Sequence, residues 1–147
     1  MEFLSKESIN SKELLKQINY FRELEYKEKE ANNTLTEAQK KRGHYIELRH
    51  DNLLRTIRDE FNIQDNRLNF EEVKNKIIPT SVEGIFETTY RDNKGEFRTM
   101  FILTIDQAKQ VLLRESKVVR KAVIQYLNLL EKRIRELERK KGKITRK

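Results

Sequence analysis

The residues best suited to chemistry lie in one short segment, residues 47–61, which reads ELRHDNLLRTIRDEF. Asparagine can pair bidentately with adenine and arginine with guanine, and a helix that presents such side chains from its first two turns fits the major groove of DNA. The side chains in this segment that could face base edges are Arg49, Asn52, Arg55 and Thr56. A solvated helix face has a similar composition, so the residue types leave both interpretations open.

A helical projection separates these polar side chains from the apolar ones. When each residue is placed about 100° after the last, one sector contains His50, Leu53, Leu54, Ile57 and Phe61. The opposite sector contains Arg49, Asn52, Arg55, Thr56 and Asp59. The pattern therefore predicts a helix from about 49 to 61 that buries the first group and exposes the second.

A β-hairpin is predicted over residues 85–103. Two runs rich in aromatic and β-branched residues, 85–90 and 97–103, flank the sequence RDNKGE, which supplies Asp, Asn and a Gly able to adopt positive φ. We expect Arg91, Lys94 and Arg98 around the tip to hold phosphates together with Arg58, although cations at an exposed turn also serve solubility. A helix pair followed by such a hairpin is the order of a winged helix.

Neither histidine has the neighbours that a metal site or a catalytic base requires. His50 shares the apolar sector of its helix, His44 lies beside Gly43 in a polar segment, and the chain contains no Cys. Zinc requires three or four convergent ligands, and the sequence has no recognisable nucleophile motif and no glycine-rich phosphate loop. We therefore expect no metal, no cofactor and no catalytic residues, so that the protein is not an enzyme.

The remaining elements are expected to be mostly helical. Apolar spacing predicts a helix from about 12 to 26 with Ser11 as its N-cap, followed by a polar link at about 27–44 that contains a short helix capped by Thr36 and ended by Gly43. Residues 62–84 are predicted to be mostly connection, with one helical turn near FEEV, residues 70–73. A further helix is expected to start at Thr104 or Asp106, and a last one runs from about 117 to 140.

The last helix has the spacing of a coiled coil. Val123, Leu127, Leu130, Ile134 and Leu137 are separated by four, three, four and three residues. This seam predicts a parallel homodimer in which Arg133 and Glu138 of opposite chains meet. A neighbouring stripe of Val119, Ala122 and Tyr126 is expected to pack on the hairpin of its own chain, while the second half of the helix projects and pairs.

Length and charge fit one small basic domain. The chain has 147 residues, 36% of them hydrophobic, and a net charge of +8, which suits a polyanionic partner. Residues 39–105 are nearly neutral, with twelve basic and eleven acidic side chains, whereas residues 106–147 contain fourteen basic and five acidic ones. The cluster of Arg114, Lys117, Arg120 and Lys121 could add positive charge to the DNA-binding unit if it folds back beside it.

No apolar run approaches the roughly 20 residues of a membrane helix, and the start MEFLSKES is short and acidic for a secretory signal. The sequence therefore predicts a cytoplasmic protein without a membrane partner.

Two stretches resemble the phage regulatory protein Rha family. The segment ELRHDNLLRTIRDEF resembles the family's His-x-x-Leu-Leu-x-x-Ile-Arg signature, and residues 88–132, from TTYRDNKGEF to YLNLLEK, resemble the remainder. The resemblance covers roughly residues 9–26 and 45–135, and the link in between is about twenty residues longer than in the family. It implies a regulator encoded by a temperate phage or prophage, which acts in the bacterial cytoplasm and binds DNA through a winged-helix-like N-terminal part.

The sequence thus predicts an α+β protein. Residues 1–104 are expected to form a small winged-helix-like DNA-binding unit with the inserted link at about 27–44, and residues 105–147 a basic helical region that mediates dimerisation. The expected function is that of a phage or prophage regulator that binds duplex DNA. The alternative is an antirepressor-type module that binds another phage or host regulator.

Overall fold

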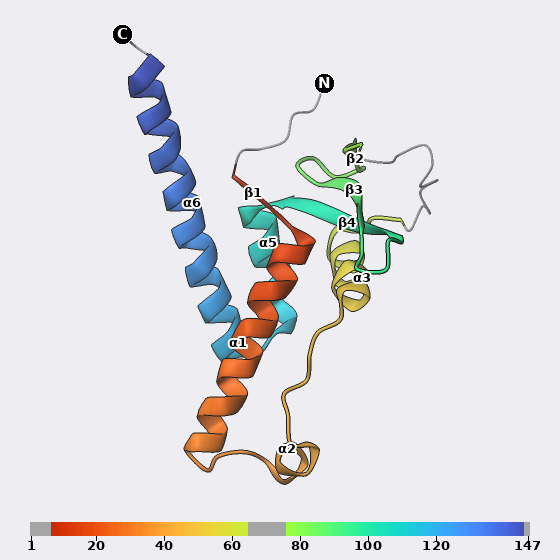
Figure 1. Ribbon diagram of the computed structural model, residues 1–147, viewed down its shortest axis with the longest axis vertical. Helices are drawn as coiled ribbons and strands as arrows, with labels where there is room; N and C mark the ends of the chain where they lie inside the picture. Colours follow the sequence, from red (N-terminus) through yellow and green to blue (C-terminus); the bar gives the residue numbers. More distant parts are fainter. Residues whose placement is uncertain (1–6, 65–75, 146–147) are drawn as a thin grey trace.

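The computed structural model describes residues 7–64 and 76–145, so the helical turn expected near FEEV lies outside the described residues. Figure 1 shows the arrangement of the elements. In chain order they are β1 (Ser8–Asn10), α1 (Ser11–Ala31), α2 (Glu37–Arg42), α3 (His50–Phe61), β2 (Ile78–Pro79), β3 (Phe86–Arg91), β4 (Phe97–Thr104), α5 (Ile105–Val111), the 3-10 helix η1 (Leu112–Arg114) and α6 (Lys117–Thr145).

The strands form one antiparallel sheet of four strands in the order β1-β4-β3-β2. The predicted hairpin is its centre, with β3 and β4 paired from Phe86 opposite Ile102 to Arg91 opposite Phe97. The α+β class is therefore confirmed, but the expectation of a single hairpin was incomplete. Strands β1 and β2 contain only three and two residues, so neither is long enough to show an alternating pattern.

Two long antiparallel helices, α1 and α6, lie side by side next to the sheet, and the C-terminal half of α6 extends past it (Figure 1). One hydrophobic core joins α1, α3, the sheet, α5 and the first half of α6, and it runs across the division expected after Thr104. Leu53, Leu54 and Ile57 of α3 are buried in it, as the helical projection predicted. Among the described helices, none has a stretch apolar and long enough to cross a membrane.

The position of α6 differs from both expectations for that helix. It packs mainly against α1, α5 and η1 rather than on the hairpin, and the Tyr126 hydroxyl of the stripe expected there donates to Glu13 of α1 at 3.3 Å. Val123 and Leu127 of the expected dimer seam are fully buried within their own chain, and Leu130 and Ile134 are partly covered. The seam from Val123 to Leu137 is therefore not free to bind a second chain, because α1 and the core already occupy most of it.

The start of α1 also differs by one residue from the prediction. Asn10, not Ser11, is the N-cap, and its side-chain oxygen accepts the backbone N–H of Glu13 at 2.8 Å. Ser11 is instead the first helical residue and is completely buried. Both residue types cap helices well, and only the tertiary contacts of Ser11, described below, decide between them.

The polar link between α1 and α3 is ordered and is fastened to one face of α1. Its short helix α2 has the predicted ends, with a capping box between Thr36 and Gln39 and Gly43 in the left-handed conformation at φ 77°. The Asn19 side chain donates to the Leu48 carbonyl at 2.9 Å and accepts the Leu48 N–H at 2.7 Å.

The same face of α1 continues to hold the link further along the helix. Tyr26, seven residues after Asn19, donates its hydroxyl hydrogen to the Gln39 carbonyl at 3.2 Å. Helix α1 extends to Ala31, beyond its predicted end at 26. The added turns are the part of α1 beside which α2 lies (Figure 1).

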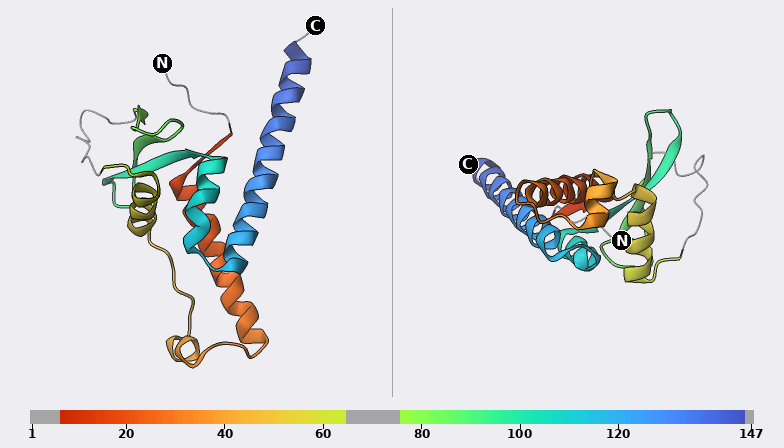
Figure 2. Two further views of the ribbon diagram at one scale, coloured as in Figure 1. Left: turned by 180° about the vertical axis from the view of Figure 1, so that it is seen from behind. Right: turned by 90° about the horizontal axis from the view of Figure 1, so that it is seen from below.

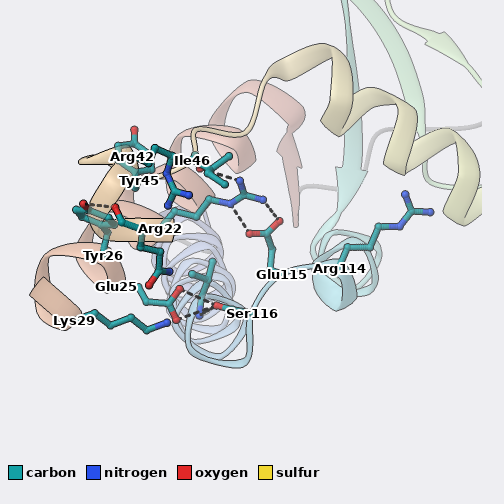
Figure 3. Close-up of a pocket in the computed structure, with 12 residues that line it drawn as sticks. Arg22, Glu25, Tyr26, Lys29, Arg42, Tyr45, Ile46, Arg114, Glu115 and Ser116 are labelled. Carbon is teal, nitrogen blue, oxygen red and sulfur yellow. Dashed lines mark hydrogen bonds and ion pairs between the residues drawn. The ribbon is translucent and has the colours of Figure 1, made fainter. Parts of the chain in front are cut away.

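A hollow of about 210 Å³ marks the junction of α1, the link and the start of α6 (Figure 3). Arg22 donates from two nitrogens to both carboxylate oxygens of Glu115, each at 2.7 Å, and from its third to the Ile46 carbonyl at 3.0 Å. The Ser116 hydroxyl donates to Glu25 and accepts the Val119 N–H, which caps α6. Because these charged groups bind one another, the hollow is best explained as a structural joint.

Replacement of Ile57 by Ala tests the orientation of α3. The side chain is fully buried, so its truncation should leave a cavity and lower the free energy of unfolding by about 2 to 5 kcal/mol. Arg55→Ala, on the exposed side of the same helix, should change it by less than about 0.5 kcal/mol. Denaturant unfolding followed by circular dichroism measures both, and equal losses in the two variants would mean that the helix is rotated.

Candidate nucleic-acid interface

Helix α3 presents most of the predicted base-facing residues to solvent. Arg49, which is its N-cap, and Asn52 and Arg55 in its first two turns are exposed, and Thr56 is half-buried. The Thr56 hydroxyl donates to the Asn52 carbonyl of its own helix at 3.1 Å. Thr56 is consequently less suited to a base contact than the other three side chains.

Arg58 has a different orientation from these residues. It is half-buried, and its guanidinium lies 5.4 Å from the centre of the Phe101 ring on β4. It therefore faces the sheet, at the inner side of the space between α3 and the hairpin.

A cleft of about 610 Å³ separates the first half of α3 from the hairpin, whose turn lies beside α3 in Figure 1. Its floor contains Leu15, Leu48 and Leu54, and Tyr90 and Phe97 contribute aromatic side chains. Three residues predicted to bind DNA line this cleft, namely Arg49, Arg58 and Arg98. The fold thus brings cations from α3 and from the hairpin to one opening.

The hairpin tip is a rigid turn built around Asp92. One oxygen of Asp92 accepts the N–H groups of Lys94 and Glu96, both at 2.9 Å, and Gly95 adopts a φ of 81°, which explains the glycine there. Arg98 donates to the other Asp92 oxygen at 3.0 Å. The hydrogen bond from Arg98, followed by those from the backbone, lowers the pKa of Asp92.

The three predicted phosphate-binding residues of the hairpin differ in their surroundings. Lys94 is exposed at the turn, Arg91 lies 4.7 Å from the Phe97 ring, and Arg98 also pairs with Glu96 at 3.1 Å. Exposed ion pairs of this kind contribute little free energy, typically up to about 1 kcal/mol. A phosphate could therefore replace the carboxylates as the partner of Arg98.

The basic cluster after the hairpin is divided between two places. Arg114 of η1 lies beside α3, where it pairs with Asp59 at 3.6 Å and donates to the Thr56 hydroxyl at 3.4 Å. The other members, Lys117, Arg120 and Lys121, lie on the first turns of α6. Of the four cations that could compensate for the neutral unit, Arg114 is therefore the one in contact with α3.

His50 connects α3 to the rest of the site. Its Nε2 lies 2.9 Å from the Ser11 hydroxyl and its Nδ1 lies 3.2 Å from the Tyr90 hydroxyl, while the Ser11 oxygen accepts the Phe101 N–H at 3.0 Å. The Nζ of Lys12 lies 4.2 Å from the centre of the Tyr90 ring. Burial, and then the charge of Lys12, lower the pKa of His50.

Sequence reasoning missed Ser11, Lys12 and Tyr90 as parts of this site. The one available signal was a histidine in the apolar sector of a helix, because a buried imidazole needs polar partners. Within residues 7–64 and 76–145, no three His, Cys, Asp or Glu side chains are grouped so that they could hold a metal ion.

Comparison of the chain with protein-family models, curated proteins and solved structures gave no match. The resemblance to the Rha family therefore stays a prediction.

The lowered pKa of His50 predicts a pH dependence of stability. The folded state binds a proton less readily than the unfolded chain, whose histidine titrates near its ordinary value of 6.5. The resulting stabilisation is therefore full above the unfolded pKa and is lost as the pH falls from there through the lower pKa of the folded state. The melting temperature should drop between about pH 7.5 and about pH 5.5.

His50→Gln should flatten this dependence, whereas His44→Gln at an exposed position should retain it. Thermal unfolding at a series of pH values compares the three proteins. If the His50→Gln curve runs parallel to that of the wild type, His50 is not the group responsible.

Proposed function

We propose that this protein is a DNA-binding regulator that contacts duplex DNA through α3 and the β3–β4 hairpin in the manner of a winged helix. The observation that carries the proposal is the cleft between these elements, where Arg49 and Arg58 of the α3 segment and Arg98 of the hairpin converge. The resemblance of residues 47–61 and 88–132 to the Rha family supports the setting, which is that of a phage or prophage regulator in the bacterial cytoplasm.

In the proposed complex, the start of α3 enters the major groove. Asn52 and Arg55 are exposed there and can each make a bidentate contact to a base edge. The half-buried Thr56 is expected to contribute by position rather than by its hydroxyl, which its own helix holds.

The hairpin and the cleft are proposed to hold the DNA backbone. Lys94 at the turn and Arg91 beside it are exposed, and Arg58 and Arg98 face the opening of the cleft. Arg114 lies at the other side of α3, next to Thr56. Phosphate contacts of this kind fix register and orientation and carry no direct base information.

The alternative function, an antirepressor-type module acting on another regulator, predicts a different response to salt. Binding to duplex DNA releases counterions, so its affinity falls steeply as the salt concentration rises. Titration with a random duplex library at several salt concentrations measures this response. Salt-insensitive binding to a host or phage protein, without binding to the library, would favour the alternative.

Asn52→Ala and Arg55→Ala are expected to reduce sequence discrimination while the fold stays intact, because both side chains are exposed. Each bidentate base contact typically contributes about 1 to 3 kcal/mol of discrimination. Selection of preferred sequences from the random library gives the preference of each variant. Glu60→Ala, at the exposed far end of α3, is the matched control, and equal preference in all four proteins would remove α3 from the recognition surface.

Replacement of Arg91, Lys94 and Arg98 by Gln is expected to weaken binding to all sequences about equally. The slope of log affinity against log salt should flatten by about 0.9 for each phosphate that the variant no longer neutralises. A variant with Gln at Lys27, Lys40 and Lys41, which are exposed on α1 and α2, has the same net charge and is the control. If the hairpin variant changes which sequence is preferred, the hairpin reads bases instead.

A further inference from the structure

Helices α1 and α6 share an exposed apolar face on the side where they lie against each other. Its outer part consists of Leu129 and Val118 of α6, which are 63% and 53% exposed, and of Tyr20 and Leu24 of α1, which are 52% and 44% exposed. Between the two helices runs a groove of about 450 Å³ lined by Gln17, Phe21, Ala122, Gln125, Tyr126, Leu129, Leu130 and Arg133. We refer to these side chains together as the α1–α6 face.

Both helices contribute to this face with the spacing of a helix-bundle seam. Gln17, Phe21 and Leu24 of α1 are separated by four and three residues. Ala122, Tyr126, Leu129 and Arg133 of α6 are separated by four, three and four residues. Such spacing places side chains in line along a helix and suits packing against further helices at a shallow angle.

This face is distinct from the buried seam of α6. Val119, Val123 and Leu127 point into the core of their own chain, whereas the α1–α6 face lies on the outside of the helix pair. It is also separate from the candidate nucleic-acid interface, because α3 and the hairpin lie on the other side of the molecule in the view from below (Figure 2).

We propose that the α1–α6 face binds the same face of a second copy of this chain, so that the two helix pairs form a four-helix arrangement around a two-fold axis. The charges along the face favour this partner. On α1 the charged positions in line with the groove are acidic, Glu13 and Glu28, and Glu13 accepts hydrogen bonds from the groove residues Gln17 and Tyr126. On α6 they include Arg133 and, seven residues later, Lys140.

Two-fold symmetry selects which helices meet. If α6 of one protomer lies against α1 of its partner, basic positions face acidic ones, and the symmetry repeats this contact on the other side. If α6 lay against α6, the Arg133 and Lys140 positions of the two chains would oppose each other. The first arrangement therefore has both apolar and electrostatic complementarity.

Sedimentation equilibrium of the full chain up to about 100 micromolar tests the proposal through its concentration dependence. The wild type should be a dimer at the upper end, and Leu129→Asp should raise the dimer dissociation constant about tenfold or more, because it would bury an unpaired carboxylate. Leu137→Asp is the matched control, since Leu137 lies on the same helix, is 56% exposed and is outside the groove. Circular dichroism should show the same fold for all three proteins.

The possible outcomes separate the explanations. A wild type that stays monomeric over this range overturns the proposal and leaves the face to a different protein. Dissociation by Leu137→Asp together with an intact Leu129→Asp dimer also overturns it, because the coiled-coil seam would then mediate association. Neither result depends on DNA binding.

The arrangement of the helices is tested by the sign of one charge change. Arg133→Glu should weaken the dimer several-fold if α6 faces α1 of the partner, because two acidic groups would then meet. It should strengthen the dimer if α6 faces α6, since the like charges at that position would be removed. A strengthened dimer would rule out the proposed pairing of α6 with α1.

Discussion

The buried hydroxyl of Ser11 is the contact on which the geometry of the candidate interface depends. It accepts the N–H of Phe101 in β4 and lies within hydrogen-bonding distance of His50 at the start of α3, and His50 in turn contacts Tyr90 of β3. One short chain of polar atoms therefore joins the beginnings of α1 and α3 to both strands of the hairpin. Because buried polar groups are costly when unpaired, these elements can move apart only with a loss of hydrogen bonds.

Helix α1 extends this constraint to the rest of the molecule, because each of its faces has a different partner. Leu14 and Ile18 enter the core, Asn19 and Tyr26 hold the link, and Arg22 binds Glu115 just before α6. The path of the link, and hence the point at which α3 begins, follows from the residues on the second face. The longer link therefore does not loosen α3, since its last residues are fixed to α1 at Leu48.

Much of this arrangement could be predicted from the sequence where local physics decides it. The buried face of α3, the glycine turn of the hairpin and the end of α2 at Gly43 all follow from spacing and backbone preference. The errors arose where distant residues decide. Asn10 and Ser11 are both good caps, and the choice depends on the bond from Phe101, ninety residues away. The heptad pattern of α6 records only that a stripe is buried, and burial against α1 gives the same pattern as burial against a second chain.

The charges around α3 explain how a nearly neutral unit could still suit a polyanion. The arginines there lie beside carboxylates, with Arg49 near Asp51, Arg98 near Asp92 and Arg114 near Asp59. Such exposed pairs hold the long side chains close to their working positions at little cost, but they also leave an acidic group nearby when the arginine turns to a phosphate. Weak non-specific attraction would follow, and a larger share of the affinity would then have to come from the base-facing side chains Asn52 and Arg55.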